Sequence, residues 1–117
     1  MDPEEKVEQA KVCKEKGTQF FKQEKYRLAI KQYKKIVDYL QFDSGLSQEK
    51  KEEHSSVLLA GHLNLSMCYL KLNDYIHAKD NACKALNIDS NNIKGLFRKG
   101  QALYHLGEPE LAKKEFK

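Results

Sequence analysis

The chain has 117 residues, a net charge of +4, and a composition that is 40% hydrophobic and 32% charged. These values fit one globular, helix-leaning domain and exclude a disordered or collagen-like chain. No apolar run approaches the ~20 residues of a membrane span, and the polar first residues predict no secretory signal. The small excess of basic residues permits an acidic partner without requiring nucleic acid.

The apolar periodicity and the helix boundary residues predict six helices that follow one another in pairs. The first is expected over about 4–22, because Asp2, Pro3 and Glu5 form a start signal with a cap, a first-turn proline and a capping-box acid. A polar stretch at 43–47 separates the first pair from the second. The later helices are expected over about 25–42, about 48–71, about 75–87 with Asp74 as its cap, from Asn91 or Asn92 to Leu106 and Gly107, and from Pro109 onwards.

The pairs repeat along the chain with a fixed period. Ala78 and Ala112 are 34 residues apart, and so are Ser66 and Gly100. Thirty-four residues is the period of the tetratricopeptide repeat, a helix-turn-helix unit. Ala29 and Ala78 are 49 residues apart, which is one period plus an insertion of 15 residues.

Small residues are expected where the first helix of each pair approaches the second closely, at Gly17, Ser66 and Gly100. The fold predicted from this register is all-α, a right-handed superhelix of three tetratricopeptide helix-turn-helix pairs of which the last is truncated. As a single domain over 1–117 it divides into repeat 1 at about 8–42, an insertion at about 43–57, repeat 2 at about 58–90, and an incomplete repeat 3 at about 91–117.

Stacked repeats form a concave surface lined by the first helix of each pair. Side chains at inner-face spacing on these helices are Lys14, Thr18, Phe21, Asn64, Met67, Lys71, Lys94 and Arg98. Neighbouring cations create a positive field that an acidic ligand would relieve, and an asparagine amide can hold a peptide backbone or a terminal carboxylate. Each cation alone is interpretable as a solvated surface charge, but the set across three repeats favours a binding site.

Five segments carry a resemblance to a known family: KEKGTQFFKQEKY (14–26), QYKKIVDYL (32–40), HLNLSMCYLKL (62–72), KALNIDSNN (84–92) and KGLFRKGQAL (94–103). The chain resembles the tetratricopeptide-repeat domain of the large FKBP-type immunophilins, co-chaperones of the carboxylate-clamp class. The resemblance implies binding of the Glu-Glu-Val-Asp carboxyl terminus of heat-shock protein 90 and, in some members, of heat-shock protein 70. It also implies a cytoplasmic and in part nuclear protein whose full-length parent is a peptidyl-prolyl isomerase.

Matched by motif, the clamp would consist of Lys14, Asn64, Lys94 and Arg98, with Thr18 at a fifth position where asparagine is common. Each side chain is then expected to bind one part of the tail. Lys14 and Asn64 would bind the carboxylates of the terminal aspartate, and Lys94 and Arg98 would bind an upstream carboxylate and a backbone carbonyl. The apolar residues of the tail, its valine or residues upstream, would contact Phe21 and Met67. The alternative is a generic repeat scaffold that binds an internal segment or a partner domain and ignores chain termini.

No catalytic, metal or cofactor site is predicted. The four histidines, His54, His62, His77 and His105, lack metal-ligand spacing, and His62 falls at a packing position. No glycine-rich phosphate loop is present. The three cysteines, Cys13, Cys68 and Cys83, lack a paired motif and are expected to be reduced thiols. The charged run at 49–54 is expected to be a solvated helix face.

Overall fold

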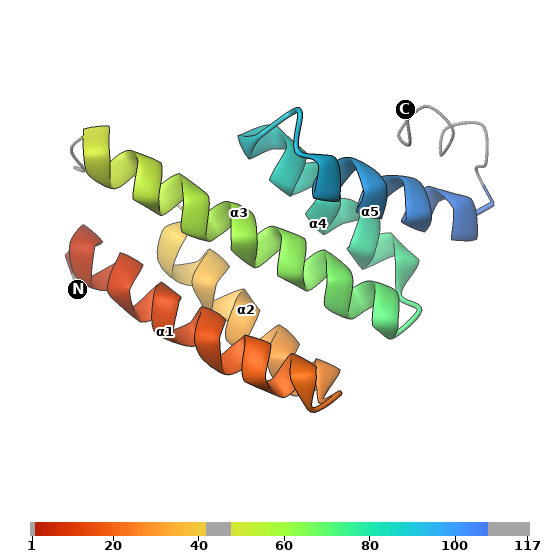
Figure 1. Ribbon diagram of the computed structural model, residues 1–117, viewed down its shortest axis with the longest axis horizontal. Helices are drawn as coiled ribbons and strands as arrows, with labels where there is room; N and C mark the ends of the chain where they lie inside the picture. Colours follow the sequence, from red (N-terminus) through yellow and green to blue (C-terminus); the bar gives the residue numbers. More distant parts are fainter. Residues whose placement is uncertain (1, 42–47, 108–117) are drawn as a thin grey trace. The chain divides into compact units, whose positions relative to one another are not determined.

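The computed structural model describes residues 2–41 and 48–107, and within them the chain forms five α-helices and no strand. The helices are α1 (Pro3–Lys22), α2 (Tyr26–Leu40), α3 (Gln48–Lys71), α4 (Tyr75–Ile88) and α5 (Ile93–His105) (Figure 1). They form two compact units, Met1–Gly61 and His62–Lys117, and α3 contributes residues to both. The predicted all-α class is confirmed.

Side-chain caps set the helix starts largely as expected. Asp2 accepts a hydrogen bond from the backbone N–H of Glu5 at 2.8 Å, and Asp74 accepts one from His77 at 3.3 Å. Asn92, rather than Asn91, caps α5 by accepting from the N–H of Gly95 at 2.9 Å. The predicted sixth helix and the polar stretch at 43–47 lie outside the described residues.

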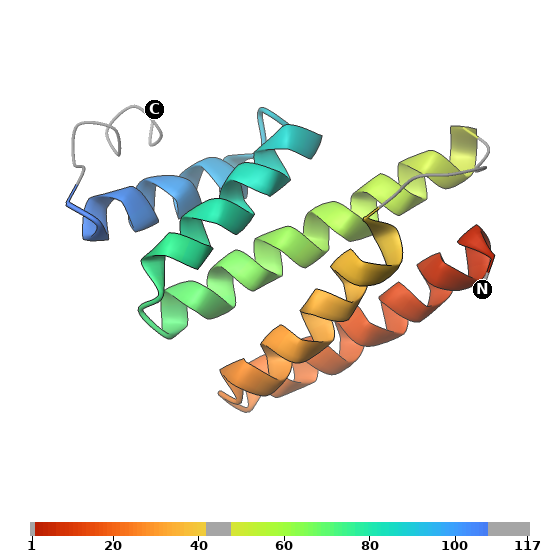
Figure 2. The same ribbon diagram turned by 180° about the vertical axis from the view of Figure 1, so that it is seen from behind.

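In the first unit, α1 and α2 run side by side (Figure 1, Figure 2). Gly17 is buried against the ring of Tyr33, and a Cβ atom added there would lie 2.6 Å from a ring carbon. Ile36 and Leu40 of α2 are completely buried, and Gly61 of α3 lies against Ile36. The predicted close approach at Gly17 is therefore present, with a tyrosine ring as the neighbouring group.

In the second unit, α4 packs against α5, and the close approach of α3 to α4 is made by Ser66. Its hydroxyl donates a hydrogen bond of 2.7 Å to the backbone carbonyl of Ala78, and both residues are completely buried. Cys68, also fully buried, has its thiol pKa raised to about 12 by desolvation. This thiol is therefore protonated and unreactive at neutral pH.

The two described turns within repeat pairs have the same geometry, 49 residues apart. Glu24 and Asn73 both adopt a left-handed backbone with φ of 62°. The residue after each donates its N–H to a carbonyl five residues earlier, with N···O distances of 2.9 Å from Lys25 and 2.9 Å from Asp74. This equivalence agrees with the repeat register read from the sequence.

The predicted solvated face at 49–54 is wrong for two residues. His54 is only 6% exposed, and the carboxylate of Glu53 forms an ion pair with Lys11 of α1. The reason is that the run forms the first two turns of α3, and one side of those turns is covered in the first unit. None of the described helices is both long and apolar enough to cross a bilayer.

Candidate peptide-binding site

The predicted site residues fall into two groups, one in each unit. Lys14, Thr18 and Phe21 lie on α1 in the first unit. Asn64 and Met67 of α3, with Lys94 and Arg98 of α5, lie in the second unit. Each group is described in its own unit below.

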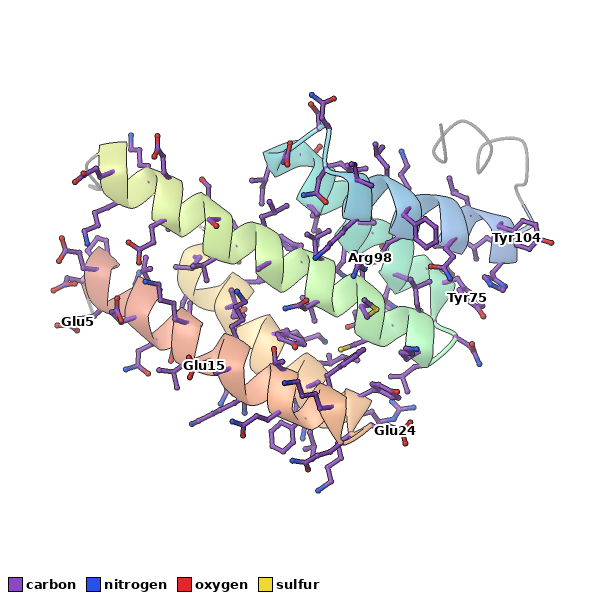
Figure 3. The ribbon with its side chains drawn as sticks, in the orientation of Figure 1. Glu5, Glu15, Glu24, Tyr75, Arg98 and Tyr104 are labelled. Carbon is purple, nitrogen blue, oxygen red and sulfur yellow. The ribbon has the colours of Figure 1, made fainter. Side chains whose placement is uncertain are left out.

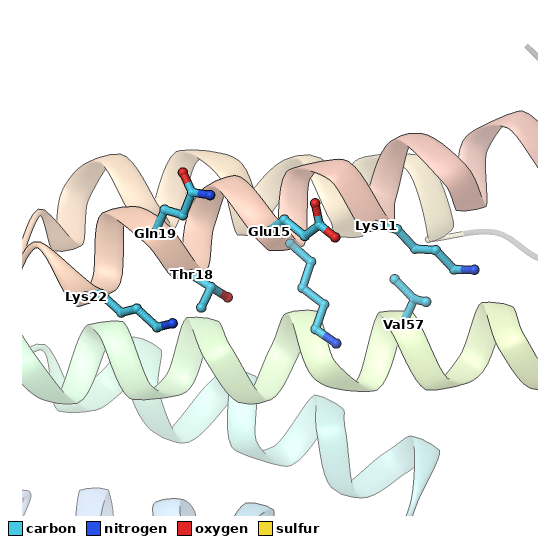
Figure 4. A pocket seen from close by; sticks show the side chains of 7 residues that line it. Lys11, Glu15, Thr18, Gln19, Lys22 and Val57 are labelled. Carbon is cyan, nitrogen blue, oxygen red and sulfur yellow. The ribbon is translucent and has the colours of Figure 1, made fainter.

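The first group lies beside an open pocket of about 500 Å³ that runs along α1 (Figure 4). Spacings of three and four residues place its α1 side chains on one face of the helix. Val57 of α3 adds an apolar side chain to the wall. The α1 residues that line the pocket are Lys11, Lys14, Glu15, Thr18, Gln19 and Lys22.

Thr18 and Phe21 each have a neighbour within the protein. The Thr18 hydroxyl lies 3.0 Å from the hydroxyl of Tyr33, and the two groups share one hydrogen bond. Phe21 is half-buried and packs edge-on against Tyr26, with ring centroids 5.3 Å apart. Thr18 thus lines the pocket with its hydroxyl engaged, whereas Phe21 lies at the end of α1 and does not line it.

The pocket carries an excess of positive charge. Lys11 is paired with Glu53 of α3 and lies 3.6 Å from Glu8 of its own helix. Within residues 2–41 and 48–107, neither Lys14 nor Lys22 has an acidic partner. Two ammonium groups of the pocket are therefore available to a negatively charged ligand.

In the second unit, Arg98 points from α5 toward α3 and is only 8% exposed (Figure 3). Its Nη2 atom lies 3.9 Å from the sulfur of Met67, and its buried Nε has no hydrogen-bond partner among the described residues. In the part of the chain that is described, no carboxylate pairs with it. Burial lowers the pKa of Arg98, but a guanidinium group stays charged in proteins.

Two further polar side chains belong to this group. Lys94 is exposed and lies one helical turn before Arg98, so the two cations share a face of α5. Asn64 is half-buried, lies three residues before Met67 on α3, and forms no side-chain hydrogen bond with any described residue. The structure thus brings Arg98 against Met67, with an amide and a second cation on the same two helices.

Sequence reasoning missed three contacts of these groups: the burial of Arg98, the engagement of Thr18 by Tyr33, and the pairing of Lys11 with Glu53. No local pattern signals any of them, because each joins residues on different helices. Sequence reasoning did place His62 correctly as a packing residue. Its Nδ1 lies 3.1 Å from the amide oxygen of Asn81, and burial lowers its pKa.

No group of metal-ligating side chains occurs among the described residues. His77 contacts Asp74 at 2.8 Å and stacks on Tyr69, but both His77 and Asp74 belong to the start of α4 and form part of its cap. The cations without acidic partners in the described part of the chain thus fit recognition of a negatively charged ligand.

A profile of the tetratricopeptide repeat matches residues 59–92. Over 116 residues the chain is 48% identical to the peptidyl-prolyl cis-trans isomerase FKBP4 of Bos taurus. That match covers 99% of this chain and 25% of the relative, so the chain spans about a quarter of the relative's length.

Two solved structures share the fold. The C-terminal TPR-containing domain of an FK506-binding protein from Plasmodium falciparum has a TM-score of 0.93 and 36% identity, over 98% of this chain and 77% of that one. The second TPR domain of Spaghetti (RPAP3), solved bound to the HSP90 peptide SRMEEVD, has a TM-score of 0.78 and 27% identity, over 97% and 86% of the two chains. The predicted repeat fold is thereby confirmed.

Proposed function

Because the chain belongs to the tetratricopeptide-repeat domains of FKBP-type immunophilins, we propose that it docks its parent protein onto heat-shock protein 90 by binding the acidic carboxyl terminus of the chaperone. The chain itself carries no FKBP catalytic domain. Isomerase activity is a property proposed for the longer parent protein. Heat-shock protein 70, which can end in the same four residues, is the second candidate partner. We propose the cytoplasm and the nucleus as the compartments in which the protein binds these chaperones.

The observation that supports this function most strongly is the state of Arg98. A guanidinium group that is 8% exposed normally has an acidic partner, because an unpaired buried charge is costly. Within residues 2–41 and 48–107 the Arg98 Nε has no hydrogen-bond partner, and the one polar contact of the side chain is a thioether sulfur, a weak acceptor. A carboxylate or carbonyl oxygen from a ligand would supply the missing acceptor, with Lys94 one turn away adding a second charge.

The proposed clamp residues have the following roles, given group by group. In the first group, Lys14 would hold a carboxylate of the terminal aspartate. In the second group, Asn64 would hold a carboxylate of the terminal aspartate, and Lys94 and Arg98 an upstream carboxylate and a backbone carbonyl. Thr18 would contribute a weaker hydrogen bond, because its hydroxyl is already shared with Tyr33. Phe21 and Met67 would offer apolar surface to the valine or to residues upstream of it.

Charge-assisted hydrogen bonds contribute about 1.5–3 kcal/mol each, and ordering a flexible tail offsets much of that gain. We therefore expect micromolar affinity, on the order of −8 kcal/mol, and a decrease in affinity with added salt.

The test is a calorimetric titration with the SRMEEVD peptide as the free acid and as the carboxyl-terminal amide. A clamp requires the terminal carboxylate, so the amide should bind at least tenfold more weakly. Lys14→Ala should reduce affinity by about tenfold, whereas Lys16→Ala, the same charge change on an exposed residue of α1 outside the pocket, should alter it less than twofold. Equal binding of the two peptides would favour a scaffold that ignores chain termini.

Arg98 needs a substitution that keeps the unit folded. Arg98→Met preserves most of the buried aliphatic stem beside Met67 while it removes the guanidinium group. The variant should retain its helical circular dichroism and lose at least tenfold in affinity for the free acid. Full binding by a folded Arg98→Met protein would show that the buried guanidinium group has another role.

A further inference from the structure

Lys11 lines one end of the α1 pocket, and its ammonium group is already held by the chain itself. It is paired with Glu53 of α3 and lies 3.6 Å from Glu8. In Figure 4, Lys11 and Val57 lie at one end of the pocket and Lys22 at the other. The hydrogen bond between the two side chains raises the pKa of Lys11 and lowers that of Glu53, so both are charged at neutral pH.

Glu53 lies one helical turn before Val57, which lines the same pocket. Its carboxylate is therefore an acidic group placed beside a pocket whose other lysines lack acidic partners among the described residues. The side chains of Lys11 and Glu53 are 44% and 33% exposed, so an incoming ligand can reach both partners.

We propose that Glu53 is a built-in competitor that limits the affinity of the α1 pocket for acidic peptides by occupying Lys11. A peptide with a carboxylate upstream of its terminal aspartate displaces Glu53 and takes its place on the ammonium group. This role rests on the proposed function, since the competing carboxylates are those of the acidic tail.

The spacing of the two lysines suits such an exchange. Lys11 and Lys14 are three residues apart on one helix face, which is roughly 4.5 Å along the helix axis. Neighbouring residues of an extended peptide advance about 3.3–3.6 Å. In the Glu-Glu-Val-Asp tail the nearest upstream glutamate lies two residues before the terminal aspartate, roughly 6.6–7.2 Å away in an extended peptide. A tail with its terminal aspartate on Lys14 therefore has this glutamate within reach of the long, flexible Lys11 side chain.

The pair is also weak enough to exchange. Ion pairs between exposed side chains add little stability, because water and salt screen them and both side chains lose conformational freedom. The released Glu53 carboxylate returns to solvent and remains charged. The expected gain from removing the competitor is therefore a few-fold in affinity.

Glu53→Gln tests this role, and Glu52→Gln is its matched control. Glu52 is exposed, lies in the same helical turn and has no ion pair among the described residues, so both variants remove one negative charge from the same segment. Glu53→Gln should tighten binding of SRMEEVD by about three- to tenfold, and Glu52→Gln by less than twofold. The double variant Lys11→Gln/Glu53→Gln should return to wild-type affinity, because it removes the released ammonium group.

Peptide chemistry gives a second readout. A peptide of sequence SRMQQVD keeps the terminal aspartate but lacks the upstream carboxylates, so Glu53→Gln should bind it no more tightly than Glu52→Gln does. Equal affinities of Glu53→Gln and Glu52→Gln for SRMEEVD would overturn the competitor role of Glu53. The proposed function would still be supported in that case if the protein bound the free peptide more tightly than the amidated one. A wild-type protein that binds neither free nor amidated peptide would overturn both.

Discussion

The first helical hairpin, α1–α2, and the second, α3–α4, use equivalent positions 49 residues apart, yet they fill the contact between their helices with opposite combinations of side chains. Gly17 faces the ring of Tyr33, whereas the equivalent positions of the second hairpin hold Ser66 and Ala82. In the first hairpin a large ring lies against a residue without a side chain, and in the second both positions hold small side chains. The repeat therefore fills the same two positions in two different ways.

The exchange alters what lies on the proposed ligand side of each hairpin. In the first, the Tyr33 hydroxyl reaches Thr18, a residue of the pocket wall. The position equivalent to Thr18 in the second hairpin is Met67, whose sulfur contacts Arg98. One repeat position thus holds a threonine of the pocket wall in one unit and a methionine against a buried cation in the other.

The largest expected effect comes from converting the first contact into the second. Tyr33→Ala removes a ring that is only 2% exposed and should lower the free energy of unfolding by about 3–5 kcal/mol. Gly17→Ser places new atoms against that ring and should cost about 1–3 kcal/mol. The double variant Gly17→Ser/Tyr33→Ala copies Ser66 and Ala82, and should be more stable than the sum of the single losses by at least about 1 kcal/mol.

Urea denaturation of the four proteins, followed by circular dichroism, measures this coupling. Strictly additive losses would mean that Gly17 and Tyr33 do not compensate each other, and that the two hairpins reach the same spacing by unrelated routes.

A smaller loss is expected at the hydrogen bond that is specific to the second contact. Ser66→Ala removes the 2.7 Å bond to the carbonyl of Ala78 while it keeps nearly the same volume. The carbonyl still accepts within its helix, so the cost should be about 1 kcal/mol, seen as a decrease in Tm of about 4–8 °C. An unchanged Tm would show that Ser66 is selected only for its size, as Gly17 is.

Acid should distinguish the hairpins as well. His62 in the second corresponds to Cys13 in the first, and both side chains are buried. Burial lowers the pKa of His62, so below about pH 6.5 the unfolded chain binds a proton that the folded chain does not. The free energy of unfolding should therefore fall as the pH decreases from 7.5, until the folded pKa is reached.

His62→Gln removes this titration and keeps a side chain that can hydrogen-bond to Asn81. Urea denaturation of the wild type and the variant at pH 7.5 and 5.5 should show the smaller change in the variant. Identical pH dependence in the two proteins would show that His62 is not the source of the acid sensitivity.

Much of this comparison was readable in the sequence. Small residues at Gly17 and Ser66 indicate the register of the repeats, and Asp2 and Asp74 indicate helix starts that the structure confirms. For the fifth helix the sequence leaves Asn91 and Asn92 as alternatives, and the structure selects Asn92. These features are local or periodic, and both kinds of pattern are expressed directly in sequence spacing.

The partners of individual side chains were not readable. Arg98 and Lys94 are both basic residues on one face of α5, yet one is buried against Met67 and the other is exposed. Glu53 and Glu52 are adjacent acids, and only Glu53 meets Lys11. Which of two similar residues is covered depends on small rotations of packed helices, and spacing along the chain does not encode these.

The smallest expected effect concerns the hydrogen bond between Thr18 and Tyr33. Tyr33→Phe keeps the ring against Gly17 and removes only the hydroxyl, so the free energy of unfolding should fall by about 0.5–1 kcal/mol. The Thr18 hydroxyl then turns to the pocket, and affinity for the acidic tail should rise by less than about threefold, which is under ~0.7 kcal/mol. Because that gain acts through Thr18, it should vanish in the Thr18→Val background, with Tyr39→Phe as a control for loss of a hydroxyl elsewhere on α2. If the gain in affinity persists in the Thr18→Val background, it arises from a change in the packing of the first hairpin and not from the Thr18 hydroxyl. The equivalent positions Thr18 and Met67 would then differ only in how they pack.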